Sequence, residues 1–249
     1  MSRRDFMSAL TITIDGPAGV GKSTLAKSLA KHLGTPYLNS GSLYRAVAWK
    51  VSKQGVNTDD EDAVLALCKT TNFLLSLQGD YQSVVVDGTR LTHELWTSHI
   101  SLIASEISRL PTVRTFLRPI QRHCGNDKGI VAEGRDMGTH VFADAEIKVF
   151  LDASPTIRAQ RRFLELQGHD AAVSHETAAS ELMERDTRDA NRNSAPLRPA
   201  SDATIIDTTD LSAIQVVDAI LALIKQRQIK HRSDPTPTID TTKQSLASY

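Results

Sequence analysis

Apolar positions along the chain alternate between short continuous runs and repeats at helical spacing. Residues 11–14 are β-branched throughout and stop at Asp15-Gly16, which predicts a short buried strand. Over residues 23–33, apolar side chains recur at helical spacing, and Gly34 follows as an end signal. The same patterns predict strands near 11–14, 37–38, 130–132, 146–151 and 204–206, and helices near 23–33, 42–53, 98–109, 111–123, 155–167, 176–189 and 212–228. Because strands and helices alternate, we expect an α/β fold with a five-stranded parallel sheet flanked by helices.

Residues 72–96 interrupt this alternation. Residues 72–77 and 81–86 have the composition of strands, and the three residues between them, Gln78-Gly79-Asp80, have the composition of a turn. We therefore expect a small antiparallel β insertion at about 72–96.

Local signals predict the boundaries of other elements. Thr58 and Glu61 have the spacing of a capping box, so Thr58 is the expected N-cap of a helix. Ser154-Pro155 is an N-cap residue followed by proline at the first helical position. After residue 229 the chain is polar and without periodicity. We expect one domain over residues 10–228 and a disordered C-terminal tail over 229–249.

Composition excludes several classes of protein. The 29 Lys and Arg residues balance 29 Asp and Glu residues, so a protein that coats nucleic acid through bulk positive charge is excluded. Two cysteines, Cys68 and Cys124, exclude a disulfide scaffold, and we expect both to be small core thiols on helices. Apolar runs are too short to cross a bilayer, and the first residues lack an apolar signal core. We expect a cytoplasmic protein with no membrane or nucleic-acid partner.

One motif carries specific chemistry. Residues 16–23 read Gly16-Pro17-Ala18-Gly19-Val20-Gly21-Lys22-Ser23, the pattern G-x-x-x-x-G-K-S, between a predicted strand and a predicted helix. The backbone N–H groups of such a loop and the positive end of the helix hold phosphate oxygens. Lys22 should reach the β- and γ-phosphates of a nucleoside triphosphate, and Ser23 should bind Mg²⁺ through its hydroxyl. The alternative, a glycine-rich turn with an ordinary surface lysine, is disfavoured by the flanking elements.

The phosphate loop alone does not separate kinases from GTPases and ATPases. A GTPase should carry [NT]-K-x-D, and the nearest candidate, Thr242-Lys243-Gln244-Ser245, lacks the aspartate. Arg135 directly follows a predicted strand, at the edge where α/β sheets bind ligands. Phosphoryl transfer between nucleotides gathers many negative oxygens, which guanidinium groups neutralise while holding oxygens in pairs. For any single arginine, a solvated helix face is the alternative.

Five segments resemble bacterial cytidylate kinases in order and spacing. They are Ile14-Asp15-Gly16-Pro17, Asn39-Ser40-Gly41-Ser42-Leu43-Tyr44-Arg45, Glu133-Gly134-Arg135-Asp136-Met137-Gly138-Thr139, Val149-Phe150-Leu151-Asp152-Ala153-Ser154 and Glu184-Arg185-Asp186-Thr187-Arg188-Asp189-Ala190-Asn191-Arg192. The resemblance covers about residues 10–226. It implies a P-loop kinase with the insertion at 72–96 in its nucleoside monophosphate-binding region and a helical lid at about 155–192. The implied reaction is transfer of the γ-phosphoryl group of ATP, with Mg²⁺, to CMP or dCMP by a monomer.

The resemblance also implies roles for individual residues. The CMP-binding set is Ser40, Tyr44, Arg45, Ser105, Arg114, Arg135, Asp136, Arg185, Asp189 and Arg192. Ser105, Arg114 and Asp136 match the positions that read cytosine, where a carboxylate and a guanidinium suit the donors and acceptors of the base edge. The ATP-binding set is Gly16, Pro17, Ala18, Gly19, Val20, Gly21, Lys22, Ser23, Thr24 and Arg158. The catalytic set is Lys22, Arg135, Arg162 and Arg185, with Ser23 as the Mg²⁺ ligand and Glu133 orienting a magnesium-bound water. For at least one of Arg158, Arg161 and Arg162, a solvated helix face is the alternative.

Four positions depart from the family pattern. Asn39 and Glu133 stand where aspartate is usual, and Arg90 and Trp96 replace insertion residues expected to be acidic and basic. We expect catalysis by alignment and charge neutralisation without a covalent intermediate, because the phosphate of CMP is already anionic. The alternatives are a P-loop kinase for UMP, AMP or a non-nucleotide acceptor, and a non-catalytic nucleotide sensor.

Overall fold

A five-stranded sheet forms the centre of the computed structural model, which describes residues 10–125, 129–167 and 174–233. The strand order is β2 (Tyr37–Asn39), β6 (Ile130–Gly134), β1 (Thr11–Asp15), β7 (Ile147–Asp152) and β8 (Thr204–Asp207). Every neighbouring pair in this sheet is parallel, and Ile12 lies opposite both Val131 and Ile147. The predicted parallel α/β sheet is therefore confirmed, with strand ends within two residues of expectation.

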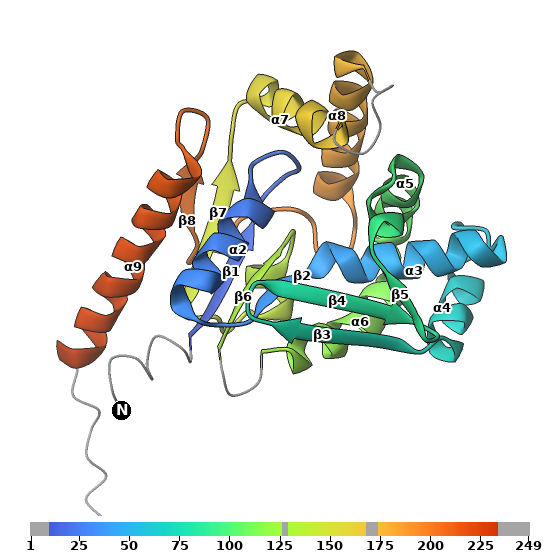
Figure 1. Ribbon diagram of the computed structural model, residues 1–249, viewed down its shortest axis with the longest axis horizontal. Coiled ribbons are helices and arrows are strands. Elements are labelled where there is room, and N and C mark those ends of the chain that lie inside the picture. Colours follow the sequence, from blue (N-terminus) through green and yellow to red (C-terminus); the bar gives the residue numbers. More distant parts are fainter. Residues whose placement is uncertain (1–9, 126–128, 168–173, 234–249) are drawn as a thin grey trace, which may run out of the picture.

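Two helices pack with the central strands into one hydrophobic cluster (Figure 1). They are α2 (Lys22–Leu33), which contributes Leu25 and Leu29, and α9 (Ala213–Ser233), which contributes Ile220 and Ile224. Gly34 ends α2 in the left-handed conformation that a glycine adopts without strain. The helix α9 continues to Ser233, past the expected end near 228, so the expected tail does not begin at 229. The rest of that expectation, residues 234–249, lies outside the described residues.

Four further helices build a second cluster. They are α3 (Ser40–Gln54), α4 (Glu61–Thr70), α5 (Ser98–Ile107) and α6 (Pro111–His123), which bury Leu43, Ile107 and Leu117 against one another. The predicted capping box at Thr58 is wrong. Asp60 is the N-cap of α4 and accepts from the Ala63 N–H, whereas the Thr58 hydroxyl donates to Glu106.

The predicted insertion is a three-stranded antiparallel sheet. Its strands are β3 (Phe73–Gln78), β4 (Tyr81–Val86) and β5 (Thr89–Leu91), of which β5 was not predicted, and a one-turn helix (His93–Trp96) follows. The insertion is joined to the edge strand β2, because the Tyr37 N–H donates to the Gly79 carbonyl and the Asn39 N–H to Gln82 Oε1. It therefore lies beside the start of α3.

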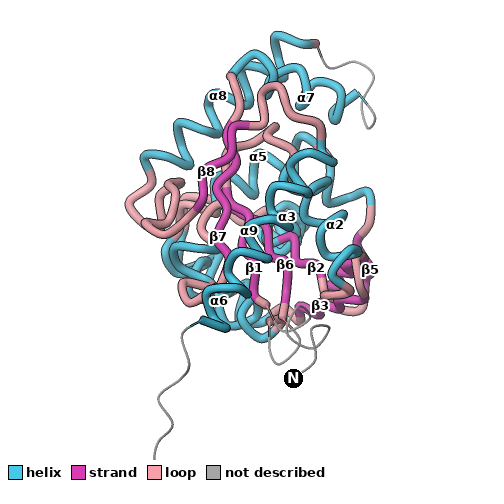
Figure 2. The backbone as a smooth tube through the Cα atoms, turned by 90° about the vertical axis from the view of Figure 1, so that its left-hand side faces the viewer, coloured by secondary structure: helices cyan, strands magenta, loops and turns pink. Residues whose placement is uncertain are grey.

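The two helices α7 (Pro155–Gln167) and α8 (His175–Asn191) pack together beyond the carboxyl end of β7 (Figures 1 and 2). They correspond to the predicted lid. Cys68 is buried in α4, as expected, but Cys124 is half-buried and directly follows α6, so it is not a core thiol on a helix. Burial raises the pKa of each thiol to about 11. Within the described part of the chain, no helix has the length and apolar character needed to cross a membrane.

Candidate active site

The phosphate loop turns sharply between β1 and α2. Gly16 and Gly19 have φ angles of 148° and 77°. A Cβ on Gly16 would lie 2.3 Å from the Leu151 carbonyl oxygen, and a Cβ on Gly19 would lie 2.5 Å from the Arg158 carbonyl oxygen. Only glycine fits these two positions. Lys22 follows the loop as a buried side chain whose Nζ donates to the Pro17 carbonyl at 2.5 Å. The loop therefore has the close-packed form that presents backbone N–H groups to a phosphate.

Lys22 is buried among two guanidinium groups and two carboxylates. Burial and then the Arg135 guanidinium hold the pKa of Lys22 well below its usual range, against the opposing effect of Glu133. Burial of an ammonium group beside a guanidinium is unfavourable unless an anion offsets the charge. The loop lysine is thus placed to gain from a bound phosphate.

Asp15, at the end of β1, ties the loop to the segment after β6. Its two oxygens accept from the Met137 N–H at 2.9 Å and the Gly138 N–H at 2.7 Å. Those residues belong to a single π-helical turn, Met137–Val141, which sequence reasoning did not predict. Burial raises the pKa of Asp15 to about 6. This carboxylate positions backbone rather than facing the cavity.

One cavity of about 510 Å³ joins most of the predicted site residues. It is lined by Ala18, Gly19, Val20, Gly21, Lys22, Ser23, Thr24, Ser40, Tyr44, Arg45, Ser105, Arg114, Glu133, Arg135, Asp136, Arg162, Arg185, Asp189 and Arg192. Three predicted residues do not line it: Gly16, Pro17 and Arg158. Segments from the phosphate loop, the first turn of α3, the end of β6 and the helices α7 and α8 thus meet around one space.

A guanidinium and a carboxylate form a buried pair at one end of the cavity. Arg114 Nη2 lies 2.5 Å from Asp136 Oδ2, and the two side chains are 5% and 7% exposed. The Arg114 guanidinium also lies 5.5 Å from the Tyr44 ring centroid. Close by on α5, the buried Ser105 hydroxyl has no hydrogen-bond partner among the described residues. This end offers an acceptor, donors and an unpaired hydroxyl to a polar, uncharged ligand group.

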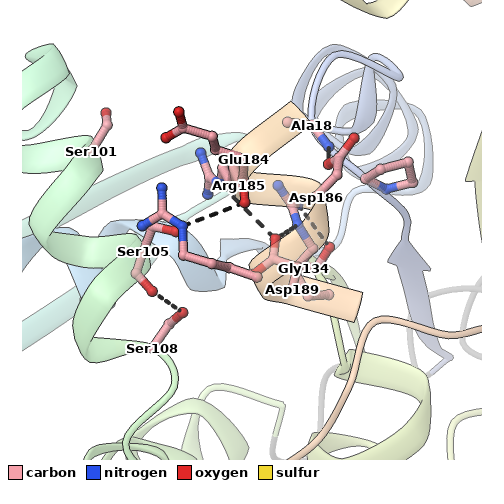
Figure 3. Close-up of polar contacts among 12 residues, drawn as sticks. Ala18, Ser101, Ser105, Ser108, Gly134, Glu184, Arg185, Asp186 and Asp189 are labelled. Atoms are coloured by element: carbon pink, nitrogen blue, oxygen red, sulfur yellow. Dashed lines mark hydrogen bonds and ion pairs between the residues drawn. The ribbon is translucent and has the colours of Figure 1, made fainter. Parts of the chain in front are cut away.

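Asp189 of α8 holds three arginines together. Its oxygens lie 2.9 Å from Arg135 Nε, 4.0 Å from Arg185 Nε and 3.5 Å from Arg192 Nη1. Burial opposes ionisation of Asp189, but these guanidinium groups outweigh it and hold its pKa below the ordinary value. Figure 3 shows Arg185 and Asp189 on α8 together with Ser105 of α5. One carboxylate cannot neutralise three guanidinium groups, so this region keeps a net positive charge.

Arg158 differs from its expected place. Its guanidinium forms an ion pair with Asp186 of α8 and donates to the Ala18 carbonyl at 3.4 Å. Asp186 also accepts from the Ala18 N–H at 3.4 Å (Figure 3). Arg158 therefore joins α7, α8 and the phosphate loop instead of facing the cavity. Arg162, one helical turn later, does face the cavity and pairs with Glu165 at 3.0 Å. Arg161 lines the cavity too, but its guanidinium donates to Thr208 at 2.8 Å and 3.1 Å.

Sequence reasoning missed three side chains at the site. Trp96 and Glu165 line the cavity, and the Tyr37 hydroxyl donates to Glu133 Oε1 at 2.5 Å. Glu165 could have been found from helical spacing, because it lies three and seven residues after Arg162 and Arg158. No local pattern signals that Trp96 or Tyr37 would face the site.

The residues proposed for Mg²⁺ suit that ion. Ser23 and Glu133 line the same cavity, and both offer oxygen atoms, the donors that Mg²⁺ prefers. Among the described residues there is no cluster of three or more His, Cys, Asp or Glu side chains that could hold a metal. Such a cation would thus need phosphate and water oxygens besides the protein's own.

A family model and two curated relatives describe the same family. The family model described as cytidylate kinase matches residues 12–226. A cytidylate kinase of Vibrio cholerae is 42% identical over 218 residues, covering 88% of this chain and 97% of that protein. A cytidylate kinase of Pseudomonas fluorescens is 43% identical over 225 residues, covering 90% of this chain and 98% of its own. A solved gluconokinase from Sinorhizobium meliloti aligns with 92% of this chain and 99% of its own, at 13% identity and a TM-score of 0.47.

Proposed function

We propose that this chain, which belongs to the cytidylate kinase family, transfers the γ-phosphoryl group of ATP to CMP and so produces ADP and CDP. The observation that carries the proposal is the single cavity that joins the phosphate loop to the Arg114–Asp136 pair. A triphosphate bound at the loop and a monophosphate whose base meets that pair would place their phosphates end to end. We extend the proposal to dCMP as a second acceptor.

The reaction is a direct transfer between the two nucleotides. An oxygen of the CMP phosphate bonds to the γ-phosphorus, the bond to the β,γ-bridging oxygen breaks, and ADP leaves with that electron pair. Lys22, Arg135, Arg162 and Arg185 offset the negative charge of the phosphates during the transfer. When bound, Mg²⁺ neutralises phosphate charge, with Ser23 and Glu133 as the residues that would hold it, Glu133 through a water.

The Tyr37 hydroxyl supports Glu133 in this role. Its hydrogen bond to Oε1 fixes the orientation of a side chain that is one methylene longer than aspartate. The buried pair of Tyr37 and Glu133 thus compensates for the greater flexibility of the glutamate.

The lid helices complete the site. Arg162 and Arg185 come from α7 and α8, so both can reach the phosphates only while these helices lie over the loop. The contacts of Asp186 with Arg158 and with the Ala18 N–H, which we call the clasp, hold the helices there. Closure of this kind excludes water and suppresses hydrolysis of ATP.

An assay of ADP release across CMP, dCMP, UMP and AMP tests the proposal. We expect CMP and dCMP to support turnover with ATP and Mg²⁺, and AMP to support little. Preference for AMP or UMP would identify another nucleoside monophosphate kinase, and ATP binding without turnover on any acceptor would indicate a nucleotide sensor. We also expect a cytoplasmic monomer, which gel filtration and cell fractionation would check.

A further inference from the structure

Trp96 is the last residue of the one-turn helix that ends the β insertion, and it lines the nucleotide cavity. The Arg45 guanidinium carbon lies 4.7 Å from the centroid of its ring. We infer that Trp96 is a positioning residue, which holds Arg45 by a cation–π contact in the orientation that receives the phosphate of CMP. The inference rests on the proposed function, because it requires CMP to bind in the cavity that Arg45 lines, with its phosphate at that guanidinium.

Arg45 needs a partner of this kind. Its side chain is buried, and no carboxylate forms an ion pair with it in the described part of the chain. Its Nη2 donates to Ser101 Oγ at a long 3.4 Å, and its buried Nε has no partner among the described residues. Burial, and then repulsion from Arg162, lower the pKa of Arg45 to about 10. A guanidinium placed in this way is stabilised by an aromatic face, which attracts a cation without competing for its N–H groups.

The contact also restricts where the guanidinium can turn. A Cβ on Gly41 would lie 3.3 Å from Arg45 Nη1, so the first turn of α3 approaches the guanidinium closely. Ser101 approaches it from α5, and Trp96 covers it from the insertion. Three separate elements therefore surround one cation, and Trp96 is the aromatic contact among them.

The ring itself is held by the insertion. Trp96 packs against the cluster that Val84, Val86, Leu91 and Leu95 form with Ala46 of α3. Trp96 thereby connects the small sheet to Arg45 in the lining of the cavity. Loss of the ring face should weaken CMP binding and leave ATP binding almost unchanged, because the contacts of Trp96 are with Arg45 and the cluster of the insertion and α3.

Steady-state kinetics of Trp96→Leu and Trp96→Phe test the inference. Leucine removes the aromatic face, and we expect the KM for CMP to rise about fivefold to thirtyfold, the range from an exposed to a desolvated cation–π contact, while the KM for ATP changes less than about twofold. Phenylalanine keeps an aromatic face and should restore most of the loss. Trp49→Leu is the matched control, since Trp49 packs against the same cluster as Trp96 but does not line the cavity, and the KM for CMP of this variant should change less than about twofold.

A double-mutant cycle separates positioning from general packing. If Trp96 acts through Arg45, Trp96→Leu should add less than about twofold to the KM for CMP in an Arg45→Ala background. A full additional effect there, an equal rise in the KM for ATP, or no rescue by phenylalanine would overturn the inference. Failure of the wild-type protein to phosphorylate CMP would instead overturn the proposed function.

Fluorescence gives a binding readout that does not depend on turnover. The chain has two tryptophans, so Trp49→Phe leaves Trp96 as the sole emitter. We expect CMP to change its emission and cytidine, which lacks the phosphate, to change it much less. An equal response to both ligands would contradict the link between Trp96 and the phosphate.

Discussion

Replacement of Asp136 by asparagine tests whether the buried Arg114–Asp136 pair reads the cytosine base. The carboxylate can only accept hydrogen bonds, so a base that meets it must donate one, and the exocyclic amine of cytosine is such a donor. Arg114 keeps a second acceptor, the Ser108 carbonyl at 2.9 Å, when Asp136 is changed. The substitution therefore removes one charge and one strong acceptor from the base end of the cavity and leaves its shape intact.

The size of the effect follows from the burial of the pair. A hydrogen bond to a charged partner contributes about 1.5–3 kcal/mol, which corresponds to a rise of about 10- to 150-fold in the KM for CMP. Loss of a buried partner altogether costs about 3–5 kcal/mol of folding free energy, so Asp136→Ala should also destabilise the fold. Asparagine keeps an oxygen facing Arg114 and should cost less, on the order of 1–2 kcal/mol.

The assay measures ADP release with each nucleotide varied at saturation of the other. We expect the KM for CMP to rise in Asp136→Asn while the KM for ATP stays within about twofold. Asp144→Asn is the control, because Asp144 pairs with Arg122 at 3.3 Å on the surface and is 75% exposed, and such pairs contribute little. Equal rises for both nucleotides, in a variant whose thermal unfolding remains cooperative, would refute the base-reading role.

Three further changes probe the phosphate end and the lid. Lys22→Ala should lower turnover by about two powers of ten or more, since it removes preorganised charge, and near-normal kcat would contradict its role. Asp186→Asn breaks the ion pair with Arg158 that holds the lid helices on the phosphate loop, so the KM for ATP should rise about tenfold. Asp202→Asn is its control, because Asp202 is an exposed carboxylate that pairs with Lys148, and an equal effect of the two substitutions would contradict the clasp. Asp189 has a pKa below its ordinary value because its arginine neighbours outweigh burial, so its contribution to stability is present above about pH 4 and is lost as the pH falls through the folded-state pKa. The difference in unfolding free energy between wild type and Asp189→Asn, measured by urea denaturation, should therefore shrink from pH 6 to pH 3. A constant difference would contradict stabilisation of the ionised Asp189 by its three arginine neighbours.

Periodic elements of the fold were predictable because their signals are local. The helix α2 has leucines at 25, 29 and 33 and a glycine directly after them, and the structure begins and ends it within one residue of expectation. The N-cap of α4 was not predictable, because Thr58 and Asp60 are both good caps. Distant contacts decide between them: Thr58 donates to Glu106, and Glu61 accepts from Thr112, so neither completes a capping box.

At the site, too, features set by local spacing were predictable, and features set by contacts between distant residues were not. Arg158 and Arg162 share one face of α7, and their spacing predicts the same environment for both. The first turn of that helix lies beside the phosphate loop, where Asp186 pairs with Arg158, and the next turn faces the cavity. The packing of α7 on α8 makes this distinction, and nothing in the sequence near either arginine records it. The π-helical turn after β6 is likewise stabilised by Asp15, more than 100 residues earlier in the chain.

The two ends of the cavity differ in how their charges are balanced. At the base end, Arg114 has its own carboxylate, so this end suits a neutral ligand group. At the phosphate end, Lys22, Arg45 and Arg185 come from the loop, α3 and the lid, and burial together with repulsion by neighbouring guanidinium groups lowers the pKa of each. Bringing these buried cations together therefore costs electrostatic free energy, and bound phosphates would offset that cost by their negative charge. Closure of the lid should then depend on occupancy of the phosphate end, so that water is excluded when the two nucleotides are present and admitted when they are not.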